Sequence, residues 1–158
     1  MSELNTGLTA DQQQAITAEL GKLLADSYIL KVKTHQFHWN VTGPMFNALH
    51  RMFEEQYTNI EEAVDEIAER IRALGAYAPG SFAQYAQLSA IVETQEVPTA
   101  VAMVAQLVAD HETLVRTARS VFALADEAND QPTADMVTQR MQIHEKFAWM
   151  LRSMIAKG

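Results

Sequence analysis

Apolar side chains recur at three- and four-residue steps along four long stretches of the chain, with polar side chains between them. This spacing matches the turn of an α-helix and predicts four amphipathic helices. We expect them over about residues 12–40, 45–74, 98–125 and 133–157. The side chains expected on their buried faces are Ile16, Leu20, Leu23, Leu24, Tyr28, Val32, Phe46, Leu49, Phe53, Ile60, Val64, Ile67, Ile71, Leu74, Val101, Val104, Leu107, Val108, Leu114, Val115, Val121, Phe122, Met136, Val137, Met141, Phe147, Met150, Leu151 and Ile155.

Helix-breaking residues separate these stretches. Short turns are expected at residues 40–44 and 129–132, where Asn, Asp, Gly and Pro gather. Residues 75–97 form a longer connection, in which Phe82–Leu88 is compatible with a short helix. There is no strand signal, so the pattern predicts an all-α four-helix bundle. Its short extra helix lies in the long connection between the second and third helices.

Composition narrows the function classes. The 158 residues fit one domain, 1–158, with a short N-terminal tail at about 1–9. Cysteine is absent, which excludes disulfides, cysteine-based zinc sites and thiol nucleophiles. The net charge of -8 disfavours nucleic acids and anionic membranes and favours cations. With no export signal and no apolar run near the ~20 residues of a membrane span, we expect a cytoplasmic protein with no membrane contact.

Four potential metal ligands share one stripe of the second predicted helix. His50 and Glu54 are four residues apart, and Asp65 and Glu69 repeat that step. Glu54 and Asp65 are eleven residues apart, close to three full turns. Imidazole and carboxylate together suit a metal of intermediate hardness, with iron as a leading candidate. The alternative is an ordinary solvated face, because acidic residues are dense throughout 61–69.

The spacing of these residues predicts a site shared between two chains. Eleven residues place Glu54 and Asp65 roughly 16 Å apart along the axis, too far to share one ion. The pairs 54/65 and 50/69 nevertheless have one midpoint, between Asn59 and Ile60. Two copies of the helix packed antiparallel about a twofold axis there would bring Glu54 level with the second copy's Asp65, and His50 level with its Glu69. Two equivalent sites would then form at an isologous dimer interface.

A metal site inside one chain is not supported by the sequence. Di-iron bundles of that kind use Glu-x-x-His on two helices. None of the five histidines has a glutamate three residues before it.

Residues 38–70 resemble the Dps family, or mini-ferritins. The resemblance is carried by His-Trp-Asn-Val-x-Gly-Pro-x-Phe at 38–46, Leu-His at 49–50, Glu54 and Asp-x-Ile-Ala-Glu-Arg at 65–70. It implies a ferritin-like bundle over essentially the whole chain. It also implies a ferroxidase site formed by His38, His50 and Glu54 of one subunit with Asp65 and Glu69 of its twofold mate. The family often has Asp at the position of Glu54, which keeps the carboxylate on a longer side chain.

The same resemblance implies an activity and an assembly. The protein would oxidise Fe(II), preferably with hydrogen peroxide although oxygen is an alternative, and store ferric oxide in a hollow dodecamer, which protects a bacterial cytoplasm from oxidative damage. Trp39 would lie beside the ligands and intercept stray oxidant, or serve only in packing. His35 competes with His38 as a ligand, but the motif favours His38 and leaves His35 beside it.

Three acidic residues near the start of the last predicted helix are candidates for an iron entry pore. By resemblance, such acids line threefold pores of the shell, and the matching positions are Asp126, Asp130 and Asp135. For Asp130 or Asp135, a helix-capping role is an equal alternative.

The charge pattern argues against the activity for which the family is named. DNA-binding members typically carry Lys- or Arg-rich tails, whereas residues 1–21 contain neither residue. Because few counterions would be released on binding, we expect weak or absent DNA binding at physiological salt. The alternative function is a nucleoid DNA-compacting protein in which the metal site is secondary.

Overall fold

The computed structural model describes residues 4–158 and contains five α-helices within that range. They are α1 (Ala10–Asn40), α2 (Phe46–Ala73), α3 (Phe82–Leu88), α4 (Ala100–Glu127) and α5 (Gln131–Ile155). The predicted all-α four-helix bundle is confirmed, and the four long helices agree with the predicted ranges to within a few residues. The short helix in the long connection is confirmed as α3.

Side chains just ahead of the helices explain where three of them begin. Thr9 precedes α1 and forms a capping box with Gln12, and Ser81 forms the same box with Gln84 ahead of α3. The side chain of Thr99 accepts a hydrogen bond from a main-chain amide in the first turn of α4. Each cap satisfies an amide that the helix leaves unpaired.

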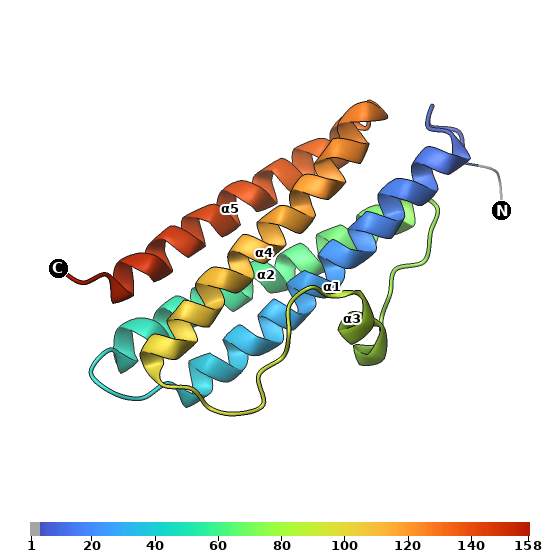
Figure 1. Ribbon diagram of the computed structural model, residues 1–158. Helices are drawn as coiled ribbons and strands as arrows, with labels where there is room; N and C mark the ends of the chain where they lie inside the picture. The colour runs from blue at the N-terminus through green and yellow to red at the C-terminus, as the bar shows by residue number, and fades with distance from the viewer. Residues whose placement is uncertain (1–3) are drawn as a thin grey trace.

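Two helical hairpins form the bundle (Figure 1). One consists of α1 and α2, the other of α4 and α5, and α1 packs against α4 between them. The connection from α2 to α4 runs along the length of the bundle, with α3 lying against α1 (Figure 1). Tyr28 of α1 stacks on Tyr85 of α3, with ring centroids 4.4 Å apart.

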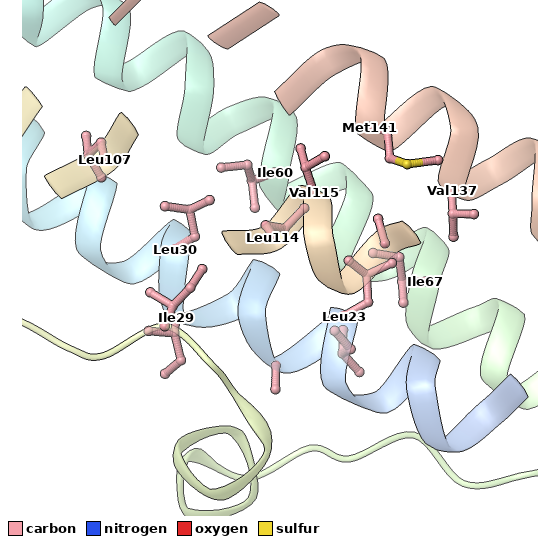
Figure 2. Packing of buried hydrophobic residues seen from close by; sticks show 14 of the residues in the cluster. Leu23, Ile29, Leu30, Ile60, Ile67, Leu107, Leu114, Val115, Val137 and Met141 are labelled. Carbon is pink, nitrogen blue, oxygen red and sulfur yellow. The ribbon is translucent and has the colours of Figure 1, made fainter. Parts of the chain in front are cut away.

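Aliphatic side chains from all four long helices fill the interior, as Figure 2 shows for Leu30, Ile60, Leu114 and Val137. Each fully buried Leu or Ile contributes about 1.5–3 kcal/mol relative to an exposed one.

The predicted core is wrong at three positions. In this chain Val32, Phe46 and Val101 are exposed to 37%, 44% and 54%. Phe46 and Val101 lie in the first turns of α2 and α4, where the other helices do not cover them. Val32 borders an open groove beside the long connection. Helical periodicity identifies the apolar side of a helix but not where along its length neighbouring helices cover it.

A buried carboxylate attaches the long connection to the bundle. Asp26 of α1 is fully buried and accepts hydrogen bonds from Ser89 Oγ at 2.8 Å, Ala90 N at 2.7 Å and Thr117 Oγ1 at 2.6 Å. Burial raises the pKa of Asp26, and these hydrogen bonds partly oppose that rise. Asp26 thereby joins α1 to the connection and to α4.

Within residues 4–158, none of the helices is both long enough and apolar enough to cross a bilayer.

Candidate metal centre

His38 and His50 lie face to face across the turn between α1 and α2, and we call them the turn histidine pair. Their rings stack with centroids 3.8 Å apart and 14° between the ring planes. Nδ1 of His38 is 2.6 Å from the carbonyl oxygen of His50, and Nδ1 of His50 is 2.8 Å from the carbonyl oxygen of His38. The two residues thus hold each other through reciprocal hydrogen bonds.

This reciprocity fixes the protons of both rings. A carbonyl oxygen can only accept a hydrogen bond, so Nδ1 donates in each ring. In the neutral form, each Nε2 therefore carries a lone pair, and no hydrogen bond from residues 4–158 reaches either Nε2. A hydrogen bond from the other ring nitrogen is the arrangement that orients metal-binding histidines in proteins.

The local sequence explains why the two rings meet. α1 ends at Asn40, and Gly43 adopts a positive φ of 102°, a conformation that favours glycine. The amide of Phe46 donates to the carbonyl of Gly43 at 3.0 Å, so α2 begins at once. This tight turn brings the last turn of α1 beside the first turns of α2.

The carboxylates predicted as ligands all lie along α2 and are exposed. Glu54 follows His50 by one helical turn and lines an open groove of about 490 Å³ together with Glu55, Thr58, Asn59 and Glu62. Asp65 and Glu69 lie farther along the same continuous helix, with Asp65 roughly 16 Å from Glu54 along the axis. A single chain therefore brings His38 and His50 together, with Glu54 close by in sequence, but leaves Asp65 and Glu69 apart from them. Across residues 4–158 of one chain, no three His, Asp or Glu side chains converge as a metal-binding group.

An aromatic column lies beside the turn histidine pair. The ring of His35 is 4.0 Å from that of Trp39 and 4.2 Å from that of Tyr57, while Tyr57 meets His38 edge-on at 5.3 Å. Burial, followed by the charges of His38 and Lys31, lowers the pKa of His35.

Tyr57, whose ring adjoins those of His35 and His38, is not among the site residues predicted from the sequence. Burial, followed by the nearby Glu54, raises its pKa. Its position three residues after Glu54, on the same face of α2, is the sequence feature that could have placed it beside the predicted ligands.

The candidate pore residues differ in their surroundings. Asp126 and Asp135 are exposed and remain candidates. Asp130 is only 4% exposed, caps α5 by accepting from the amide of Thr133, and pairs with Arg70 at 2.8 Å. Of the two roles left open for Asp130, the structure shows the capping role.

Comparisons with known proteins agree with this architecture. The family described as ferritin-like domain matches residues 17–158. A low temperature-induced protein of Nostoc sp. is 48% identical over 157 residues, covering 98% of this chain and 88% of the relative. DNA protection during starvation protein 2 of Bacillus anthracis is 38% identical over 136 residues, covering 86% of this chain and 93% of the relative.

A solved structure extends the similarity to nearly the full length of both chains. It is a Dps protein from Vibrio cholerae O1, described as a member of a broad superfamily of ferritin-like diiron-carboxylate proteins. The TM-score is 0.93 at 31% identity, covering 99% of this chain and 98% of that chain.

Proposed function

The chain belongs to the Dps family of ferritin-like proteins, and we propose that it oxidises Fe(II) and stores the ferric product. The turn histidine pair is the observation that most strongly supports this proposal. Its two Nδ1 protons are held by carbonyl oxygens, and its two Nε2 atoms have no partner among the described residues. Two such nitrogens beside the carboxylate-rich helix α2 are suited to iron, the substrate.

The rest of the site comes from a second copy of the chain in this proposal. His38, His50 and Glu54 act with the partner subunit's Asp65 and the partner subunit's Glu69. The shared midpoint of the 54/65 and 50/69 pairs supports an antiparallel α2–α2 contact. Further association of such dimers into a hollow shell, a dodecamer by family resemblance, would provide the storage space.

The proposed reaction balances with hydrogen peroxide as oxidant. Two Fe(II) ions lose two electrons, and one peroxide takes up these electrons and two protons to give two waters. Using both electrons at one site avoids releasing a hydroxyl radical. Carboxylates favour the ferric product because they are hard anionic ligands. In this proposal Trp39, which is 63% exposed and whose ring lies 4.0 Å from that of His35, donates one electron to an oxidant that escapes.

Removing ligands from both halves of the site tests the activity. The double variant His50→Ala with Asp65→Ala should lose rapid Fe(II) oxidation, followed by stopped-flow absorbance of the ferric product, while keeping its assembly. Glu96→Ala, which removes an exposed carboxylate from the long connection, is the control and should oxidise iron at the wild-type rate. Wild-type kinetics in an intact double variant would refute the site.

Mixing single variants tests the shared site. Chains carrying only His50→Ala and chains carrying only Asp65→Ala should each be inactive alone. Reassembled together at equal amounts, half of the dimers are mixed and each holds one complete site, so about a quarter of the wild-type rate should return. A site contained in one chain would show no recovery.

The charge balance also supports the expectation that the chain binds DNA weakly or not at all. The net charge is -8, and residues 4–21 carry no Lys or Arg. Little affinity from counterion release is therefore expected. Submicromolar retardation of DNA by the assembled protein in a gel shift at ~0.15 M salt would contradict this expectation and favour the DNA-compacting alternative.

A further inference from the structure

A second pair of histidines lies in the interior of the bundle, and we call it the buried histidine pair. His111 of α4 and His144 of α5 are both fully buried, and their Nδ1 atoms are 2.9 Å apart. Arg140, one turn before His144, places Nη2 2.8 Å from Nε2 of His144. Its Nη1 donates to Oδ1 of Asn59 in α2 at 2.9 Å. The chain of contacts thus joins α2, α5 and α4.

The contacts allow only one order of donors when both rings are neutral. A guanidinium can only donate, so Nε2 of His144 accepts from Arg140. The proton of His144 is therefore on Nδ1 and is donated to Nδ1 of His111. The proton of His111 is then on Nε2, a buried atom with no hydrogen-bond partner among the described residues. The order Arg140 to His144 to His111 uses every acceptor that the two rings offer.

The charges near the pair are predominantly unfavourable for a further proton. From α5 the nearest charge is Arg140, which stays positive at neutral pH although burial lowers its pKa to about 10. From α2, the charge of Glu66 acts on Arg140 and partly opposes the lowering of its pKa. On α4, Asp110 precedes His111 but is paired with Lys33 of α1 at 2.8 Å. Phe147 of α5 packs edge-on against both imidazoles.

The same level of the bundle contains further unpartnered polar atoms. α2 and α5 run antiparallel, with Asn59 beside Arg140 and Arg70 beside Asp130. One turn back from Asn59, Gln56 is therefore level with His144. Gln56 is 1% exposed, and neither its Nε2 nor its Oε1 has a hydrogen-bond partner within residues 4–158. Neither Asn59 nor Gln56 is a carboxylate that could stabilise an imidazolium.

We propose that the buried histidine pair is an acid-sensitive switch that joins α4, α5 and α2 only while both rings are neutral. A proton added to His144 removes the acceptor of Arg140 and places two cations in contact. A proton added to His111 removes the acceptor of His144. Either event breaks the ordered chain, so acid loosens α5 from its neighbours. Consistent with this geometry, burial and Arg140 lower the pKa of His111 to about 3. Burial, followed by the charges of His111 and Arg140, lowers that of His144 well below its usual range.

Unfolding of the assembled protein in guanidinium, measured from pH 7 to pH 4.5 at fixed protein concentration, tests the switch. Because unfolding frees both rings to protonate below about pH 6.5, the pair should raise the unfolding constant by up to about 100-fold per pH unit. The variant His111→Gln with His144→Gln, which keeps hydrogen-bonding groups but cannot protonate, should lose this part of the slope. Asn59→Ala is the matched control, since it weakens the same chain of contacts and leaves both rings in place. It should lower stability at every pH and keep the wild-type slope. An unchanged slope in the glutamine variant would overturn the proposal.

Nitrogen-15 solid-state NMR of the wild-type shell gives a test that needs no variant. At pH 7 and at pH 5, His144 should show the Nδ1-protonated neutral form and His111 the Nε2-protonated neutral form. Titration of either ring near pH 6.5 in the folded protein, or the opposite tautomers, would overturn the proposal.

Discussion

The turn histidine pair and the buried histidine pair are built from the same side chain but present opposite chemistry. In the turn pair, main-chain carbonyls accept the protons of both Nδ1 atoms, and both Nε2 lone pairs are left without a hydrogen bond from the described part of the chain. In the buried pair, Arg140 occupies the lone pair of His144, and the ring of His144 occupies that of His111. The turn histidine pair can therefore present two nitrogen lone pairs to a metal ion, whereas both acceptor lone pairs of the buried histidine pair are already used in hydrogen bonds.

The difference shows that the partner of each ring nitrogen decides the role of a histidine. Carboxylates follow the turn pair along α2, whereas an arginine adjoins the buried pair. A cation is thus favoured at the first pair and repelled from the second. Exposure alone would not separate the pairs, because His38 of the turn pair is itself only 7% exposed.

The largest effect should come from removing a nitrogen of the turn pair. His50→Gln should slow Fe(II) oxidation by at least about 100-fold, because it removes a ligand that no neighbouring nitrogen replaces. The free energy of unfolding should fall by only about 1 kcal/mol, the worth of one hydrogen bond. Stopped-flow oxidation and guanidinium unfolding measure the two quantities. A large loss of stability with normal oxidation would reverse the roles assigned to the pairs.

The next effect should come from the buried pair and should have the opposite profile. His144→Leu leaves the buried guanidinium of Arg140 with Asn59 as its remaining hydrogen-bond partner among residues 4–158, which should cost about 1.5–3 kcal/mol of stability. Oxidation per assembled shell should stay at the wild-type rate, because no proposed ligand is touched. Denaturation measures the first quantity and iron kinetics on purified shells the second. A stability change below about 1 kcal/mol would show that the chain from Arg140 to His111 contributes little.

A smaller effect should come from Asp26, whose response to pH has the opposite sign. Burial raises the pKa of Asp26 above 3.8, so the folded state binds its proton more readily than the unfolded state. Its contribution to stability therefore increases as pH falls through the folded pKa, whereas that of the buried histidine pair decreases below about pH 6.5. Asp26→Asn should cost about 1–2 kcal/mol at pH 7, because an amide cannot accept from all three donors. It should cost more at pH 4. A smaller cost at pH 4 than at pH 7 would contradict this sign.

Sequence patterns predicted the elements and much of the candidate site. Helical periodicity and breaker residues predicted the four long helices. Spacing along α2 selected His50, Glu54, Asp65 and Glu69, and the motif added His38. These five residues remain a proposal, since a single chain does not bring them all together.

Contacts between distant segments could not be predicted in the same way. The reciprocal hydrogen bonds of His38 and His50 depend on how the turn closes. Asp26 is 63 and 91 residues from the hydroxyls that it binds, on Ser89 and Thr117. Local sequence also left capping and pore lining equal for Asp130, and its contact with Arg70 comes from tertiary packing.

Anomalous diffraction at the iron edge, on crystals soaked with Fe(II), would show whether iron binds at the turn histidine pair. Iron peaks are expected within coordination distance of Nε2 of His38 and His50 and of Glu54. The partner subunit's Asp65 and the partner subunit's Glu69 should complete each site. Iron in the bundle interior beside His111 and His144, or no iron at the turn between α1 and α2, would contradict this expectation.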